Sequence, residues 1–139
     1  MLTDARILLT LVAVQYGIVP IFVDLGPSHI FHDEWPPHAR FHMVWLVASS
    51  TGTAVFTVWI AWGKYGKDDR CMRLACVPGF VVLGSFFVAT VLMEKYAGEL
   101  ADPAHQILIA GVDGNLFAFS IALVLQIAAT SMIMSKSAQ

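Results

Sequence analysis

The segment FHMVWLVASSTGTAVFTVWIAW (residues 41–62) contains no Asp, Glu, Lys or Arg. It is long enough to cross a bilayer as a helix, which takes roughly 20 mostly apolar residues. Further apolar stretches run over residues 7–23, 74–93 and 107–134. The polar breaks between them contain the glycines and prolines that are typical of helix connections. The sequence therefore predicts four membrane-spanning helices, over residues 7–25, 38–63, 73–94 and 105–134.

The composition favours the same fold class. The chain has 139 residues, of which 58% are apolar and 13% charged, and its mean hydropathy is +0.71. Soluble domains contain roughly 25% charged residues. The net charge of −2 gives no basic field for a nucleic acid. We therefore expect one all-α domain over residues 1–139, an integral membrane four-helix bundle whose main partner is the lipid bilayer, with no nucleic-acid partner.

The cationic residues predict an orientation. The first apolar stretch is preceded by Asp4 and a single Arg and is followed by no small-residue cleavage site, so we interpret it as a retained helix. An even number of helices places both termini and the second loop on one side. That side holds six of the eight Lys and Arg residues: Arg6, Lys64, Lys67, Arg70, Arg73 and Lys136. By the positive-inside rule, both termini are cytoplasmic, and the first and third loops face the periplasm, the exterior or an organelle lumen.

All five histidines fall on the non-cytoplasmic side, and they are the candidate metal ligands: His29, His32, His38, His42 and His105. If Pro37 opens the second helix, His38 and His42 lie one turn apart on one face and can bind one ion together. His29 and His32, three residues apart, are a second candidate pair. Imidazole ligands suit a transition metal ion such as iron, copper or zinc. The alternative is a hydrated loop at the membrane surface, where histidine and tryptophan are common.

Two carboxylates and one guanidinium are candidate catalytic groups. Asp113 is expected two turns inside the fourth helix, with His42, Arg40 or a bound ion as its partner, because an intramembrane charge is costly and usually functional. The alternative is a structural polar pair that joins helices two and four. Asp24 ends the first helix and either bonds locally in the turn or faces the histidines. Arg40 either reaches lipid phosphates, pairs with Asp24, Asp33 or Asp113, or anchors a substrate anion.

The motif WPPHARFH (residues 35–42) resembles a signature of small four-helix membrane proteins of bacteria and fungi that carry no assigned chemistry. The likeness covers the first loop, the start of the second helix and the number of helices. A weaker likeness is to membrane bundles of the sterol-isomerase and sigma-2-receptor type. That resemblance implies carboxylates and a histidine near one end of a bundle that binds a hydrophobic cation or a sterol, with Asp24 as the matching residue.

These features predict a metal-dependent membrane enzyme, with an oxidoreductase favoured, acting on a lipophilic small molecule at a His/Asp site. One alternative is a non-enzymatic protein that binds or transports a metal ion or an amphipathic ligand. Another is an acid–base enzyme of the sterol-isomerase type that uses no metal. A third is a structural subunit that joins a homo-oligomer or a membrane partner subunit.

Overall fold

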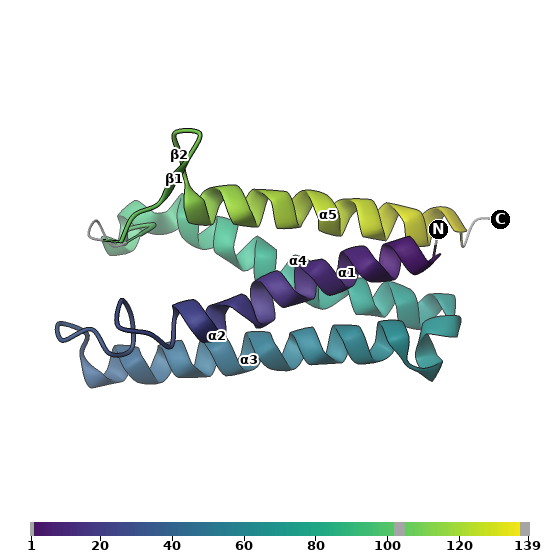
Figure 1. The fold of residues 1–139 in the computed structure, drawn as a ribbon, viewed down its shortest axis with the longest axis horizontal. Helices are drawn as coiled ribbons and strands as arrows, with labels where there is room; N and C mark the ends of the chain where they lie inside the picture. The colour runs from purple at the N-terminus through teal and green to yellow at the C-terminus, as the bar shows by residue number, and fades with distance from the viewer. Residues whose placement is uncertain (1, 102–104, 137–139) are drawn as a thin grey trace.

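The computed structural model describes residues 2–101 and 105–136. Four long helical segments form a bundle in which α1 lies between α3 and α5, while α4 packs against α3 and α5 (Figure 1). The elements in chain order are α1 (Leu2–Gly17), α2 (Val19–Val23), α3 (Pro37–Trp62), η1 (Lys64–Lys67), α4 (Asp69–Leu92), η2 (Met93–Tyr96), β1 (Leu108–Ile109), β2 (Val112–Asp113) and α5 (Gly114–Lys136). By length and composition, four helical segments can cross a membrane, as predicted: residues 3–23, 37–62, 69–96 and 114–135.

The first predicted helix is interrupted. It begins at Leu2 and breaks at Ile18 into α1 and the short α2. Pro20 accounts for the break, because proline has no backbone N–H and its ring clashes with the carbonyl four residues earlier. The prediction of a single helix over residues 7–25 was wrong on this point. α2 lies toward the end of the bundle opposite the N-terminus (Figure 1), and Asp24 follows it directly.

The second and third predicted helices are confirmed with small shifts. The second runs over Pro37–Trp62, with Pro36 in an extended conformation just before it. The third begins four residues earlier than predicted, at Asp69, because the Asp68 side chain caps it. One carboxylate oxygen of Asp68 accepts hydrogen bonds from the amides of Arg70 (2.8 Å) and Cys71 (3.0 Å), which satisfies two otherwise unpaired donors of the first turn.

The predicted start of the fourth helix at residue 105 was wrong, because a short hairpin precedes α5 in an otherwise helical fold. Residues 108–113 form a two-stranded antiparallel hairpin that projects beyond α5 (Figure 1). Its turn residues Ala110 and Gly111 both have positive φ angles, of 52° and 81°. This is the backbone of a type I′ turn, which matches the twist of paired strands. The run ILIAGV is apolar enough to be mistaken for the first turns of a spanning helix.

Packing is very uneven along the bundle. In the described part of the chain, the buried helix residues lie within residues 5–17 of α1, 47–61 of α3, 72–83 of α4 and 122–133 of α5. We call the end where α1 begins, α5 ends and residues 63–68 connect α3 to α4 the closed end. The opposite end, with residues 24–36, 93–101 and 105–113, is the open end. The helices pack tightly from the closed end to mid-bundle and separate toward the open end (Figure 1).

Polar contacts join the helices at the closed end. The Arg6 guanidinium donates to the Gly66 carbonyl at 2.7 Å and lies 6.0 Å from the centre of the Trp62 ring. The Trp62 indole in turn donates to the Thr10 hydroxyl at 2.8 Å. These contacts fix the start of α1 against the α3–α4 connection.

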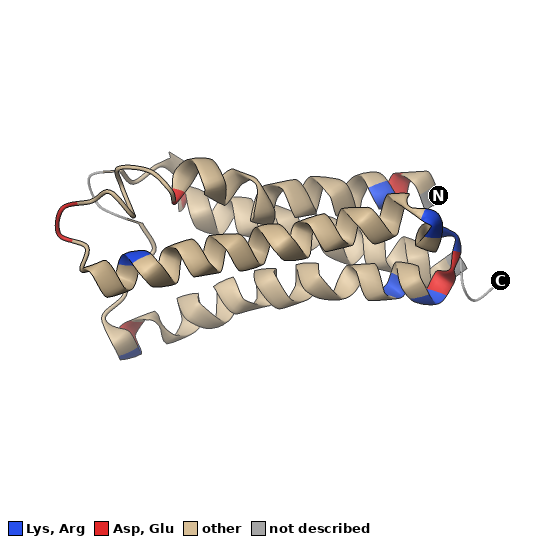
Figure 2. Cartoon of the chain, turned by 90° about the horizontal axis from the view of Figure 1, so that it is seen from below, with Lys and Arg blue, Asp and Glu red and all other residues tan. Residues whose placement is uncertain are grey.

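Among residues 2–101 and 105–136, the charged residues are confined to the two ends of the bundle, and none lies along its middle (Figure 2). The outer faces of the helices instead expose large apolar side chains, including Leu11, Val55, Val81 and Val124. Such a surface is costly in water and suits lipid. The fold therefore fits an integral, multi-pass membrane protein.

Candidate functional site

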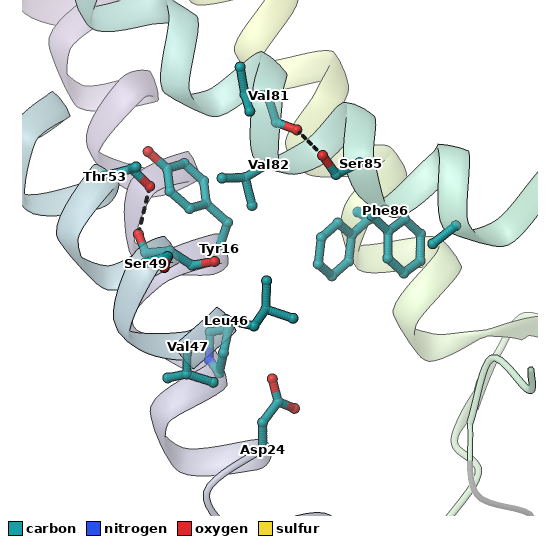
Figure 3. Close-up of a pocket in the computed structure, with 14 residues that line it drawn as sticks. Tyr16, Asp24, Leu46, Val47, Ser49, Thr53, Val81, Val82, Ser85 and Phe86 are labelled. Atoms are coloured by element: carbon teal, nitrogen blue, oxygen red, sulfur yellow. Dashed lines mark hydrogen bonds between the residues drawn. The ribbon is translucent and has the colours of Figure 1, made fainter. Parts of the chain in front are cut away.

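A pocket of about 570 Å³ opens between the helices in the loosely packed half of the bundle (Figure 3). Its walls come from α1, α2, α3, α4 and α5 and are mainly apolar. On one side lie Leu46 and Val47 of α3, and on the other lie Val82 and Phe86 of α4. Phe86 stacks on Phe119 of α5, with ring centres 3.9 Å apart. The volume lies within the range of small-molecule sites, about 300–1,000 Å³.

Hydroxyl groups line the inner end of this pocket, and most of them are already bonded. The Tyr16 hydroxyl lies 3.2 Å from that of Thr57, and Thr53 donates to the Ser50 carbonyl at 2.9 Å. Ser85 donates to the Val81 carbonyl at 2.7 Å (Figure 3). With their hydrogen-bonding capacity partly used within the protein, these groups make the inner end of the pocket less polar than its composition suggests.

Among the described residues that line this pocket, Asp24 is the one carboxylate. It follows α2 directly, its amide donates to the Pro20 carbonyl, and its carboxylate points into the space between the helices (Figure 3). The side chain is 25% exposed, and one oxygen lies 3.8 Å from Nε2 of His29. Burial raises the pKa of Asp24, and the nearby His29 opposes that rise in part. A carboxylate that lacks full solvation at the mouth of an apolar pocket is a candidate partner for a cation or a proton.

His29 is held beside Asp24 by its loop. Its Nδ1 lies 2.9 Å from the Ser28 hydroxyl, and its ring meets the edge of the Trp35 ring at 5.4 Å. Of the two alternatives for Asp24, the structure therefore favours the orientation toward a histidine of the first loop. His32, the other member of the predicted second pair, instead uses its Nδ1 to accept a hydrogen bond from the Glu34 amide at 3.3 Å.

His38 and His42 lie together as predicted, on the exposed face of the first turns of α3. Their Nε2 atoms are 3.0 Å apart. In the part of the chain that the structure describes, however, no three or more His, Cys, Asp or Glu side chains group as a metal site. The histidines thus form separate contacts and not one cluster, and metal-dependent oxidation stays a prediction.

Arg40 makes contacts other than the expected carboxylate pairs. Its Nε donates to the Trp35 carbonyl at 3.0 Å, and its Nη2 donates to the His32 carbonyl at 2.9 Å. A guanidinium offers several donors in a fixed planar array, so it can satisfy two carbonyls of one loop at once. Arg40 therefore shapes the first loop, which also carries His29.

Asp113 does not lie inside a membrane-spanning helix, and this prediction was wrong. It ends β2 and precedes α5, and its Oδ1 accepts hydrogen bonds from the amides of Asn115 (2.8 Å) and Leu116 (3.4 Å). Its Oδ2 lies 3.5 Å from the Gln106 amide nitrogen. A carboxylate in this place satisfies free amides and faces the positive end of the helix dipole. Its role is that of a helix cap.

His105, expected to open the fourth helix, precedes the hairpin and is exposed.

No sequence feature predicts the part of the pocket wall that α4 and α5 form. Val82, Ser85 and Phe86 of α4 and Phe119 of α5 are ordinary apolar or small residues of spanning helices, and no motif distinguishes them. Only the way in which the helices separate makes them pocket residues.

A comparison with known protein families, curated proteins and solved structures finds no match for this chain.

Proposed function

We propose that this protein binds a lipophilic small molecule with a basic head group in the pocket between its helices, with Asp24 facing the head group. The observation that carries the proposal is a partly buried carboxylate at one end of a pocket of about 570 Å³ with mainly apolar walls. An apolar body buried against those walls gains about 25 cal/mol for each Å² removed from water. A cationic head gives Asp24 a counter-charge that its surroundings supply only in part.

We further propose that the protein lies in a membrane. The apolar side chains on the outer faces of the helices then contact lipid, and the ligand reaches the pocket from the bilayer or from the open end. The closed end, with six of the eight Lys and Arg residues, faces the cytoplasm. The open end, with Asp24 and His29, then faces the periplasm, the exterior or an organelle lumen.

Thiol labelling tests this orientation. Cys71, at the closed end, is partly exposed, whereas Cys76 is buried. A membrane-impermeant maleimide should label Cys71 in inverted membrane vesicles but not in intact cells, and Cys71→Ser should abolish the labelling. Labelling of Cys71 in intact cells would reverse the proposed orientation.

Paired probes of equal size test the binding function. The purified, tag-free chain in lipid nanodiscs is titrated with a dansyl-labelled long-chain alkylamine and with the corresponding alcohol. The wild-type protein should bind the amine at least ~10-fold more tightly, since hydrogen bonds and ion pairs to a charged group contribute about 1.5–3 kcal/mol. Asp24→Asn should remove the preference for the amine and leave the affinity for the alcohol.

Two further variants control this experiment. Asp33→Asn changes an exposed carboxylate of the same loop and should leave the preference intact. Val82→Trp fills the pocket and should weaken the binding of both probes. If Asp24→Asn keeps the preference, or if Val82→Trp binds both probes as the wild type does, the pocket is not the binding site.

The contact between Asp24 and His29 favours a second candidate, an acid–base reaction on a bound lipophilic substrate without a metal. Two titratable groups 3.8 Å apart beside a pocket can protonate one alkene carbon of a substrate and remove a proton from the carbon next to the other alkene carbon, which shifts the double bond. Incubation with unsaturated sterol or polyprenyl substrates and analysis of double-bond position separates the two functions. A binding protein returns the substrate unchanged, and an isomerase converts it at a rate that falls in Asp24→Asn.

A further inference from the structure

A second feature of the open end lies outside the Asp24 pocket. His38 and His42 project from the first two turns of α3, and both side chains are exposed. Their rings meet edge to face, with centres 4.5 Å apart and planes at 90°. Neither residue lines the large pocket, although Leu46 and Ser49 line both that pocket and a shallow hollow beside His42. The histidine pair is thus not part of the pocket lining but adjoins the pocket along α3.

The distance between the two Nε2 atoms, 3.0 Å, is the distance that a shared metal ion requires. Imidazole nitrogens bind zinc at about 2.0–2.1 Å. Two nitrogens at that distance from one ion are about 2.9 Å apart at a right angle and about 3.3 Å apart at a tetrahedral angle. The 3.0 Å separation belongs to a hydrogen bond between the two nitrogens and lies within this interval. Binding of an ion therefore requires that the bridging proton leaves and that both nitrogen lone pairs turn toward the ion, with little change in the distance between the nitrogens.

The surroundings hold the pair in place. Pro36 and Pro37 fix the start of α3, so the two histidines stand on a regular helix and not on a loose loop. The His42 ring stacks on Trp45, with centres 5.8 Å apart and planes at 27°, and it also contacts the edge of Phe41. A ring that is already oriented loses little conformational freedom when it binds an ion.

We propose that His38 and His42 form a two-histidine site for a divalent transition metal ion, with water in the remaining coordination positions. Exposed imidazoles without a thiolate suit Cu²⁺, Ni²⁺ and Zn²⁺, and Cu²⁺ should bind most tightly among them. Because two protein ligands leave several positions open, the ion exchanges readily and remains accessible to a further ligand. The site does not depend on the Asp24 pocket and stands whether or not that pocket binds a lipophilic molecule.

Metal titration of the full-length, tag-free chain tests the proposal. Isothermal titration with Cu²⁺ should show one saturable site in the wild type, and the electron paramagnetic resonance spectrum should show coupling to imidazole nitrogens. His38→Ala and His42→Ala should each weaken binding at least ~10-fold, because each leaves a single imidazole. His32→Ala, a change in the same region whose imidazole accepts a backbone hydrogen bond, should bind Cu²⁺ as the wild type does.

Thermal unfolding gives a second readout that does not depend on Cu²⁺. Zn²⁺ should raise the unfolding temperature of the wild type relative to EDTA, and this shift should disappear in the His38→Ala/His42→Ala double variant. Both positions are exposed, so the variants should keep the helical content of the wild type, measured by circular dichroism. If the wild type binds no Cu²⁺ saturably, or if binding survives in both single variants, His38 and His42 form only an imidazole–imidazole hydrogen bond.

Discussion

The closed and open halves of this bundle are built from the same four helices but pack very differently. In the closed half, small side chains bring the helices together, among them Ala5, Ala13, Ala54, Ala61, Ala75 and Ala129. In the open half, the facing positions carry larger groups such as Leu46, Phe86 and Phe119, and they surround a pocket. Small residues allow close backbone approach, which is a main source of helix association in lipid. Tight packing is therefore concentrated at one end, and the pocket lies toward the other.

Gly17 marks the boundary between the halves, and its replacement should have the largest effect. A Cβ atom at this position would collide with the Cβ of Ala54 on α3. Gly17→Ala should therefore destabilise the protein by about 1–3 kcal/mol, the usual cost of overpacking a tight contact. The free energy of unfolding in mixed micelles measures the effect.

Gly52→Ala is the matched control for Gly17→Ala. A Cβ there would meet nothing within 4 Å. Because alanine favours a helix more than glycine does, this variant should gain roughly 0.5–1 kcal/mol. Equal effects of the two substitutions would contradict the tight contact between Gly17 and Ala54 that closes the packed half.

Removal of the cap at the open end should have an intermediate effect. Asp113→Ala takes away the oxygen that accepts the amides of Asn115 and Leu116 and should cost about 1 kcal/mol. Asp113→Asn keeps a side-chain oxygen in the same place and should be nearly neutral. A loss of stability as large in Asp113→Asn as in Asp113→Ala would indicate that the charge, and not the cap, is required.

The smallest effect concerns Asp24 in the ligand-free protein. Burial raises its pKa above the ordinary value of 3.8, so the folded state disfavours the ionised form. Above the raised pKa, the ionised carboxylate costs stability, and Asp24→Asn should unfold at a slightly higher temperature than the wild type at pH 7. The difference should shrink as the pH falls through the raised pKa and should vanish below 3.8.

Thermal unfolding at a series of pH values checks this sign. Asp33→Asn, at an exposed position of the same loop, should leave the unfolding temperature unchanged at each pH. A ligand-free wild type that is more stable than Asp24→Asn at pH 7 would mean that the contact with His29 outweighs the cost of burial.

The sequence by itself determined the architecture. A segment that lies in lipid must make its backbone hydrogen bonds within the protein. A long uncharged run such as residues 41–62 therefore folds as a helix. The spacing of His38 and His42 likewise follows from helix geometry alone, since residues four apart lie on one face. The early start of α4 also had a visible local signal, because Asp68 precedes a run of helix-forming residues and can act as a cap.

Only the tertiary structure decided the site. The apolar run before Asp113 fits a helix and a hairpin equally well, and its folding as β1 and β2 moved Asp113 from the helix interior to its cap. The pocket depends on where four helices separate, which follows from contacts between residues as distant as Gly17 and Ala54. Such contacts leave no mark in the local hydrophobic pattern, because a lipid-facing valine and a pocket-lining valine have the same chemistry. The partial burial of Asp24 beside His29 is a consequence of that three-dimensional arrangement.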